Sequence, residues 1–214
     1  MIKYLFVFIL SLSVNCFAGV TVMGTRFAFN DDSKRVYIKL MNNDKHDFLI
    51  KTTIENNNGQ FVITPALFVL TKNNTNTQLI IPVNHQKSNV DELYQLSVAM
   101  IPKSQIHSGK STVSLAVRAH FNLIYRHAEL RKADFSQLKL VKSDKGEFEL
   151  KNLSNYVFTM DLADEKNSSN AFRKTLAPQE SLSVDQFCKN SVCQVWVSFI
   201  DDDDSIVKAI YLSN

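Results

Sequence analysis

Residues 113–126 read VSLAVRAHFNLIYR, and this stretch decides the fold class. In its first half, Val113, Leu115 and Val117 alternate with small or charged residues, which is the period of a strand with one apolar face. The second half, FNLIY at 121–125, is too apolar for a simple surface strand. We therefore expect one long strand whose second half is buried in its own domain. Its first half needs a partner, either a neighbouring sheet or another protein.

Many other segments share this composition, because they are rich in β-branched and aromatic residues. In the first half of the chain they lie at 20–23, 35–40, 48–54, 78–83 and 93–101. In the second half they lie at 138–141, 147–150, 156–160, 181–184, 194–200 and 206–212. Turn clusters rich in Asn and Asp separate these segments, and no long amphipathic helix pattern competes. Short strands at this spacing predict an all-β fold made of β-sandwiches.

The strand pattern restarts after a more polar region at 129–137, which has the composition of a hinge. The length of 214 residues and the apolar content of 45% allow two domains of roughly 100 residues each. We therefore expect an N-terminal sandwich domain over 19–128 and a C-terminal sandwich domain over 129–214.

Residues 1–18 have the features of a secretory signal peptide. Lys3 supplies the positive start, residues 4–12 are apolar, and Cys16 and Ala18 are the small residues expected before a cleavage site. The apolar run is short for a helix that spans a bilayer, so we expect cleavage after Ala18 and export of the remainder. An uncleaved anchor or a first strand of the fold is the alternative.

Export changes both the number of cysteines that remain in the chain and the redox environment around them. Cys16 leaves with the signal peptide, and Cys188 and Cys193 remain as a pair in a chain bound for an oxidising compartment. Their spacing suits a disulfide across a tight hairpin. A loop this small gains little stability from closure, so we expect the bridge to pin local geometry. Two cysteines with no nearby His are too few ligands for a metal site.

No catalytic or ligand-binding motif stands out. The net charge of +3 is not the clustered basic surface of a nucleic-acid-binding domain. The five His residues are not at metal-binding spacings, and the chain has no nucleophile elbow and no phosphate loop. We therefore expect no enzymatic activity, no cofactor, no metal and no nucleic-acid partner.

Two further features have ordinary explanations. Asp201–Asp204 resembles a cluster of calcium ligands but lacks the spacing of an EF-hand loop, so we expect mainly a solvated acidic turn. Trp196 is the only tryptophan and lies between Val195 and Val197. This position predicts a core residue rather than a platform for a sugar ring.

Several short motifs follow one another in a characteristic order from Gly19 to the C-terminus. They are GTR at 24–26, TPALFVL at 64–70, ELY at 92–94, MIP at 100–102, FNLIYR at 121–126, LKN at 150–152, YV at 156–157, LAP at 176–178 and SFIDD at 198–202. The ordered set behind a signal peptide resembles the periplasmic pilus assembly chaperones of the chaperone–usher pathway. The short segment at 103–112, without extra cysteines nearby, resembles the short-loop branch of that family.

The resemblance implies two immunoglobulin-like domains in an L shape and a role in folding. Clients of this family are pilus or fimbrial subunits, immunoglobulin-like folds that lack their last strand, and the chaperone lends them an edge strand of its own. The lent side chains would be Val113, Leu115 and Val117, each worth about 1.5–3 kcal/mol when it is buried. The subunit is then delivered to an outer-membrane usher, where strand exchange replaces the chaperone without ATP.

The resemblance also implies a site for the C-terminal carboxylate of the subunit, in the cleft between the domains. Family members hold this carboxylate with an Arg and a Lys. The Arg corresponds to Arg26, whose guanidinium can bind a carboxylate through two hydrogen bonds. The Lys position is Asn122, which brings no charge. Either His120, two residues away on the same strand face, or another basic residue shares the anchoring, or Arg26 acts with Asn122 alone.

A third implied feature is an ion network that ties the two domains together. Its Arg corresponds to Arg126 and its acidic partners to Asp91 and Asp202, so one residue of the acidic turn is expected to be structural. Such pairs can set an interdomain angle even where they add little stability. Asp91 is shorter than the usual Glu, and Ala66 and His127 stand where the family often has Pro. The chain therefore resembles a divergent member.

Two alternatives from other classes remain open. The chain could be a secreted two-domain surface subunit or adhesin, although such a subunit usually has an alternating donor extension and one incomplete domain. It could also be a secreted hydrolase or carbohydrate binder. If it is a chaperone, the free protein has the option of capping its exposed strand by forming a homodimer.

Overall fold

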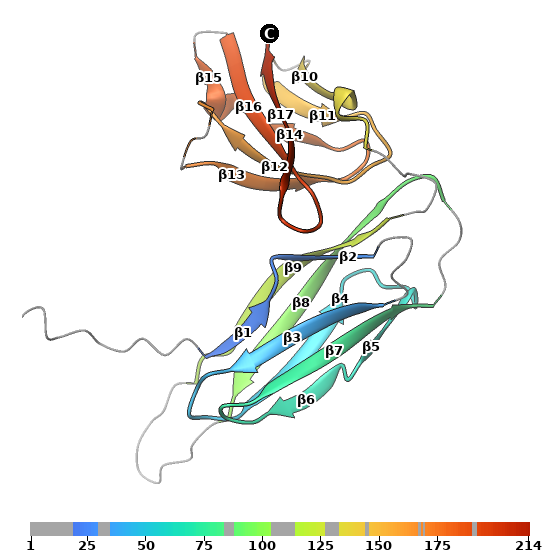
Figure 1. The fold of residues 1–214 in the computed structure, drawn as a ribbon, viewed down its shortest axis with the longest axis vertical. Coiled ribbons are helices and arrows are strands. Elements are labelled where there is room, and N and C mark those ends of the chain that lie inside the picture. Colours follow the sequence, from blue (N-terminus) through green and yellow to red (C-terminus); the bar gives the residue numbers. More distant parts are fainter. Residues whose placement is uncertain are drawn as a thin grey trace, which may run out of the picture.

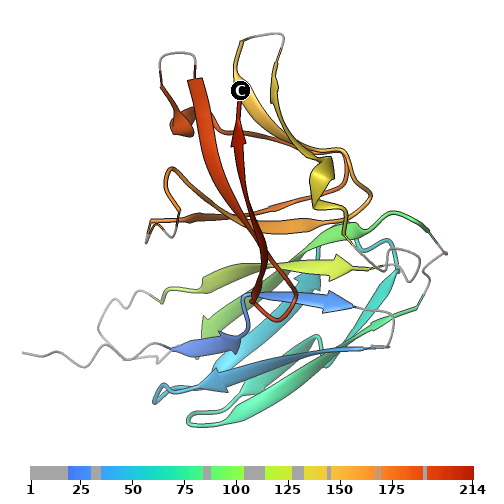
Figure 2. The same ribbon diagram turned by 45° about the horizontal axis from the view of Figure 1, so that its top comes forward.

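The computed structural model describes residues 19–29, 35–83, 88–103, 114–126, 133–143, 146–166, 168, 170–189 and 192–214. The expected signal peptide, Val113 and His127 lie outside these residues. The described chain is nearly all β and forms two sandwiches set at an angle to each other, in an L shape (Figure 1, Figure 2). The expected domain boundary at 128/129 also falls outside the described residues and stays a prediction.

The first sandwich has two sheets, with the strand orders β1-β3-β7-β5 and β2-β9-β8-β4-β6. The strands of the first sheet are β1 Val20–Met23, β3 Val36–Asn42, β5 Phe61–Thr64 and β7 Thr75–Pro82. The strands of the second sheet are β2 Arg26–Phe29, β4 Phe48–Ile54, β6 Leu67–Leu70, β8 Glu92–Pro102 and β9 Val117–Tyr125. All neighbouring strands are antiparallel except β2 and β9, which run parallel.

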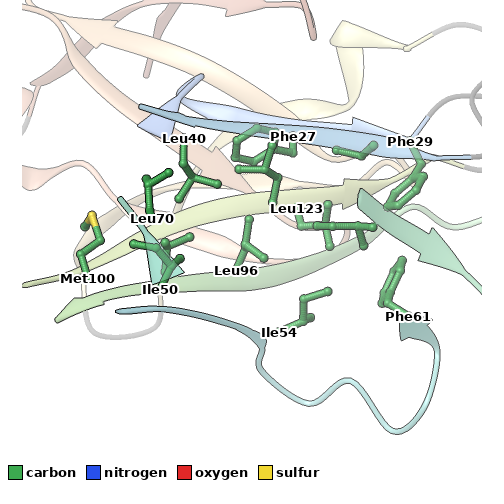
Figure 3. Packing of buried hydrophobic residues seen from close by; sticks show 14 of the residues in the cluster. Phe27, Phe29, Leu40, Ile50, Ile54, Phe61, Leu70, Leu96, Met100 and Leu123 are labelled. Carbon is green, nitrogen blue, oxygen red and sulfur yellow. The ribbon is translucent and has the colours of Figure 1, made fainter. Parts of the chain in front are cut away.

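Alternation along the strands builds the core of this sandwich. Every second residue of β3 and β4 is buried, among them Ile38, Leu40 and Ile50. Side chains from the two sheets meet in one apolar layer, in which the rings of Phe29 and Phe61 stack with their centres 5.5 Å apart (Figure 3). A side-chain period of two therefore buries one face of each sheet against the other.

The chain changes sheets at Gly24. β1 pairs with β3 in the first sheet, whereas β2 pairs with β9 in the second. Gly24 has a φ of +119°, which residues with a side chain rarely adopt, and a Cβ there would lie 3.2 Å from the Phe27 ring. The glycine thus permits the bend that places Thr25 and Arg26 at the start of β2.

The second sandwich has the sheet orders β10-β11-β14 and β13-β12-β16-β15, with β17 paired to β16. Its strands are β10 Leu138–Lys142, β11 Phe148–Asn152, β12 Phe158–Ala163, β13 Phe172–Leu176, β14 Ser181–Ser183, β15 Cys188–Lys189, β16 Val192–Ile200 and β17 Ile206–Ser213. A disulfide joins Cys188 to Cys193 at a paired position of β15 and β16. The helices of the described chain are the 3₁₀ turns η1 Phe135–Gln137 and η2 Asp185–Phe187, and none of its helices could cross a membrane.

Most strands lie where the sequence predicts them, but some short ones do not follow from it. β2, β5, β6 and β13 have weak alternation, and they become strands because each pairs with a longer neighbour. The long strand expected over 113–126 begins only at Val117 within the described chain. The expectation that Trp196 lies in the core is wrong. Cys193, Val195 and Val197 are the inward residues of β16, so Trp196 lies on the outer face, half-buried, with its ring centre 5.0 Å from that of Tyr211.

Replacing Leu96 by Ala tests the packing of the first sandwich. Leu96 lies on β8 and is fully buried between the two sheets. We expect the variant to lose about 2–5 kcal/mol of unfolding free energy, because a cavity remains in a close-packed core. Urea denaturation followed by far-UV circular dichroism measures this loss. Leu49→Ala on β4 is the control, since that side chain is 38% exposed; equal losses in the two variants would contradict the described core.

Candidate functional site

Strand β9 is paired on both sides along only half of its length. β8 runs beside it from Val117 to Tyr125, whereas β2 reaches only from Asn122 to Tyr125. Between Val117 and Phe121, the side of β9 away from β8 has no strand partner within the described ranges of the chain. The backbone N–H and C=O groups on that side form an open edge, which is a template for another strand.

Two exposed apolar side chains lie at the start of this open edge. Leu115 is 76% exposed and precedes β9, and Val117 is 58% exposed and is its first residue. Val117 shares a strand face with Phe121 and Leu123, which pack in the core of the first sandwich. One apolar face therefore runs from the core out to the open edge. Of the predicted donor residues, the two that the structure describes are not tucked into their own core, and Val113 lies outside the described residues.

A hollow of about 340 Å³ lies between the start of β2 and the second sandwich. It is lined by Thr25, Arg26, Asn122, Thr159, Arg173, Lys174 and Thr175. Arg26 and Asn122 are neighbours in it because they are register partners in the parallel pairing of β2 and β9. The bend at Gly24 and this pairing set the two residues side by side in a cleft between the domains.

The Arg26 guanidinium is buried in the wall of this cleft, with its side chain only 4% exposed. Its Nη1 lies 3.0 Å from Oδ1 of Asp204, a residue in the turn between β16 and β17. Its Nε and Nη2 are buried and have no hydrogen-bond partner in the described part of the chain. A buried guanidinium whose N–H groups lack acceptors favours an anionic ligand, because leaving buried polar groups without hydrogen bonds costs free energy.

Asn122 and His120 have different surroundings. The Asn122 amide nitrogen donates a hydrogen bond across the cleft to Oγ1 of Thr175, at 2.8 Å. His120 lies on the same face of β9, but it is exposed and its Nδ1 is 2.9 Å from Oγ of Ser97 on β8. His120 is not among the residues that line the hollow. The structure thus brings Asn122 to Arg26 and places His120 outside the cleft.

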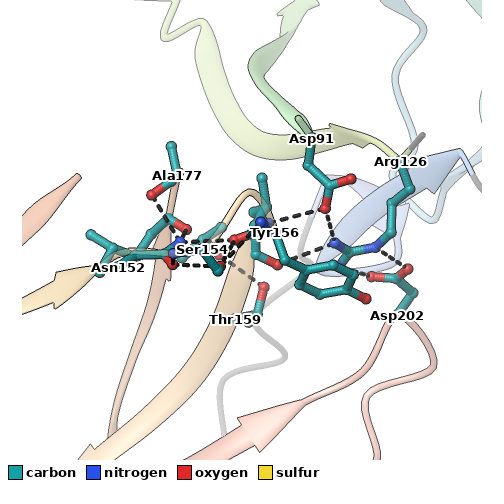
Figure 4. A network of polar contacts seen from close by, with 11 residues as sticks. Asp91, Arg126, Asn152, Ser154, Tyr156, Thr159, Ala177 and Asp202 are labelled. Carbon is teal, nitrogen blue, oxygen red and sulfur yellow. Dashed lines mark hydrogen bonds and ion pairs between the residues drawn. The ribbon is translucent and has the colours of Figure 1, made fainter. Parts of the chain in front are cut away.

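Arg126 connects the two domains through two carboxylates. Its Nε and Nη2 donate to the two oxygens of Asp202 at 2.8 Å each, and its Nη1 donates to Oδ2 of Asp91 at 2.6 Å (Figure 4). The Asp91 side chain is fully buried, and the same oxygen accepts the backbone N–H of Val157 from the second sandwich. The three residues predicted for an ion network are therefore in direct contact.

The surroundings keep the Arg126 guanidinium charged. Burial would lower its pKa, but the hydrogen bonds to Asp202 and the charge of Asp202 outweigh burial, so the pKa is raised above its ordinary value. The guanidinium also stacks on Tyr156, with Cζ 3.9 Å from the ring centre, and burial raises the pKa of that phenol. A permanent cation between carboxylates of both domains suits a fixed interdomain angle.

The turn between β16 and β17 comes close to β2 of the first sandwich (Figure 1, Figure 2). Oδ1 of Asp201 accepts two backbone N–H groups of the turn. Asp202 and Asp204 reach across to the two arginines described above. The contact of Asp202 with Arg126 is the one that was predicted, whereas the contacts of Asp201 and Asp204 do not follow from the expectation of a mainly solvated turn. Within the described ranges, no group of His, Cys, Asp and Glu residues could hold a metal ion.

Comparison with known families shows to which family the chain belongs. Residues 19–131 match the family model described as the pili and flagellar-assembly chaperone, PapD N-terminal domain. The chain belongs to this family of chaperones. The probable fimbrial chaperone YehC of Escherichia coli K12 is 25% identical over 93% of this chain and 89% of its own length. The chaperone protein LpfB of Salmonella typhimurium is 33% identical over 56% of this chain, and the match spans only 55% of LpfB.

Solved structures agree on the fold of this chaperone. A structure of the Salmonella enterica SafA pilin in complex with the SafB chaperone matches with a TM-score of 0.72 and 13% identity, over 94% of this chain and 99% of the matched one. At this identity the likeness shows the shared fold of two sandwiches. The family itself is one of chaperones, which decides against the surface subunit or adhesin that the sequence left open.

Sequence reasoning missed the half of the cleft that the second domain of the chaperone contributes. Arg173 and Thr175 lie on β13, which has weak alternation, and Asp204 lies in a turn. Their position beside Arg26 depends on how one sandwich is set against the other, and no local pattern records that. The one available signal was the run of four aspartates, since adjacent like charges call for nearby cations.

Replacing Arg126 by Gln tests the ion network of the chaperone. The change removes the cation that is bound to the buried carboxylate of Asp91, and we expect the unfolding free energy to fall by about 3–5 kcal/mol. Urea denaturation measures the loss. Arg118→Gln, at an exposed position of β9, is the matched control and should lose less than about 0.5 kcal/mol. A loss at Arg126 no larger than this control would count against the network as a structural link.

Proposed function

We propose that this chaperone binds a pilus or fimbrial subunit by adding the open edge of β9 to the unfinished sandwich of that subunit. The exposed Leu115 and Val117 carry the proposal, because they lie at a strand edge that has no partner in the described part of the chain, and such an edge is what an incomplete sheet lacks. Each side chain would contribute about 1.5–3 kcal/mol when fully buried. Val113 remains the third predicted donor residue.

In this proposal, the cleft is the second point of attachment. β2 occupies the edge of β9 from Asn122 onward, and β2 begins with Arg26. A subunit strand laid along the free part of β9 would therefore end beside Arg26, whose buried guanidinium would bind the C-terminal carboxylate. Binding the chain end at a fixed point would also set the register of the added strand, since a slip by one residue turns every side chain to the other face.

The same proposal assigns the protein to a cellular compartment and includes no catalytic step. Family members include a periplasmic chaperone, and the Cys188–Cys193 disulfide suits an oxidising compartment. We place this chaperone in the periplasm after removal of residues 1–18, with delivery of its subunits to an outer-membrane usher. Exchange of β9 for a strand of the next subunit would release the client without an enzyme or a cofactor.

Replacing Leu115 and Val117 together by Ser tests strand lending. Affinity-tagged wild-type chaperone should co-purify a fimbrial subunit from the periplasm of its native host. The double variant should co-purify at least about tenfold less, because two buried apolar side chains are lost from the complex. Ile206→Ser with Val207→Ser is the control, since both side chains are exposed apolar residues of the second sandwich. Full recovery of subunit with the Leu115 and Val117 variant would rule out this edge.

Replacing Arg26 by Gln tests the anchor separately, because the open edge of β9 stays intact. We expect the yield of co-purified subunit to fall about tenfold or more, since a charge-assisted pair of hydrogen bonds is lost. Arg35→Gln, at an exposed position before β3, is the control and should leave the yield unchanged. If the Arg26 variant retains the wild-type yield, the carboxylate of the subunit is held elsewhere.

A further inference from the structure

The carboxylate of Asp204 occupies a site built by both domains. Its Oδ1 is 3.0 Å from Nη1 of Arg26 and accepts a hydrogen bond from Nη1 of Arg173 at 3.1 Å. Its Oδ2 accepts a hydrogen bond from the Thr25 hydroxyl at 3.0 Å. Two cations and a hydroxyl thus converge on one carboxylate beside the hollow of the cleft. These groups are suited to bind a single carboxylate, and here the occupant comes from the chain itself.

Asp161 holds Arg173 in position for this contact. Nε and Nη2 of Arg173 donate to the two oxygens of Asp161 at 2.7 and 2.9 Å, which leaves Nη1 directed at Asp204. Arg173 and Asp161 are register partners on β13 and β12, so they share the sheet face that presents Thr159 and Thr175 to the cleft. The planar guanidinium is therefore oriented before any ligand arrives.

Lys174, the next residue, is oriented differently. Its register partner is Met160, which lies in the core of the second sandwich, so the Lys174 side chain leaves the opposite face of β13 from Arg173. Its ammonium group lies 4.8 Å from the centre of the Phe172 ring. Lys174 thus lines the hollow as well, but its side chain leaves β13 in a different direction from that of Arg173.

The Asp204 carboxylate is more exposed to solvent than the Arg26 guanidinium that it contacts. Arg26 is buried and keeps Nε and Nη2 without partners among the described residues, whereas the Asp204 side chain is 46% exposed in a surface turn. A carboxylate that comes from the open edge of β9 could reach N–H groups of Arg26 that Asp204 does not satisfy. Water can also solvate the half-exposed Asp204 carboxylate once it leaves Arg26, which lowers the cost of replacing it.

We propose that Arg173 is the second cation of the subunit-carboxylate site, and that Asp204 fills this site in the free chaperone until the carboxylate of the subunit displaces it, an assignment that rests on the proposed function. Arg26 binds from the first domain and Arg173 from the second, so the bound carboxylate bridges the domains. Removal of Asp204 leaves one net positive charge among Arg26, Arg173 and Asp161. The incoming carboxylate neutralises that charge.

The test measures carboxylate binding by the purified chaperone in the absence of a subunit. The probe is N-acetylphenylalanine, and its amide, which has no charge, is the control ligand. NMR titration follows the side-chain Nε–Hε signals of Arg26 and Arg173. Asp204→Asn is the key variant, because Asp204 has a φ of +65°, which Asn also adopts, and only the charge is lost. We expect this variant to bind the acid about three- to tenfold more tightly than wild type, and neither protein to bind the amide.

Further changes in the Asp204→Asn background separate the two arginines. Arg173→Gln should weaken binding of the acid about tenfold, and Arg173→Lys should restore part of it, because the positive charge returns without the planar geometry. Lys139→Gln, at an exposed position of β10 in the second sandwich and outside the lining of the hollow, is the control with the same loss of charge, and it should stay within about twofold of its parent. Thermal unfolding of each variant shows that it is folded.

The outcomes distinguish this assignment from the proposed function. Unchanged binding of the acid by Arg173→Gln would overturn the role of Arg173, and unchanged affinity of Asp204→Asn would overturn displacement. In both cases the Arg26 anchor stands if Arg26→Gln abolishes binding of the acid and capture of the subunit. If Arg26→Gln retains both, the anchor itself fails. Equal binding of the acid and the amide would overturn the carboxylate site altogether.

Discussion

The pairing of β2 with β9 begins only at Arg26 and covers β9 from Asn122 to Tyr125. The proposed binding of a subunit depends on the part of β9 that this pairing leaves uncovered. Upstream of Arg26, the bend at Gly24 takes the chain out of the second sheet and into the first as β1. If the chain had continued along β9, its own backbone would cover the edge beside Val117. Because it turns away, half of β9 has no strand partner on this side among the residues that the structure describes. The same bend leaves Arg26 at the end of the open edge, so the proposed strand site and the proposed anion site lie in one line.

Charged and polar contacts link the two domains, and the two main apolar clusters stay separate, one in each sandwich. Arg126 is bound by a fully buried carboxylate and by both oxygens of Asp202, which suits a permanent link. Two residues further along the same turn, Asp204 is half exposed and binds Arg26 through one oxygen. A pair that is buried on both sides resists exchange, whereas a pair with a half-exposed carboxylate is replaced more easily. One acidic turn thus combines a fixed contact with one that we propose to be exchangeable.

The exposed apolar edge does not weaken the fold that carries it. The first sandwich is closed by residues such as Phe121 and Leu123, and its core contains neither Leu115 nor Val117. The opposite face of β9 carries exposed polar side chains, including Arg118, which limits the apolar surface to one side of the strand. In the proposed function, stability and binding therefore fall to different residues of a single strand. Such a separation would let the proposed donor edge stay available without a cost to the core.

The sequence by itself determined the all-β class, most strand positions, the cysteine pair and, through the ordered motifs, the arginines at 26 and 126. Alternation and motif order are properties of the linear sequence, so they can be recognised without knowledge of the fold. Only the tertiary structure decided that Trp196 faces outward, that β9 is half open, and that Arg173 and Asp204 meet Arg26. These facts depend on which strands become neighbours and on the angle between two sandwiches. Both result from packing between segments that lie far apart along the chain.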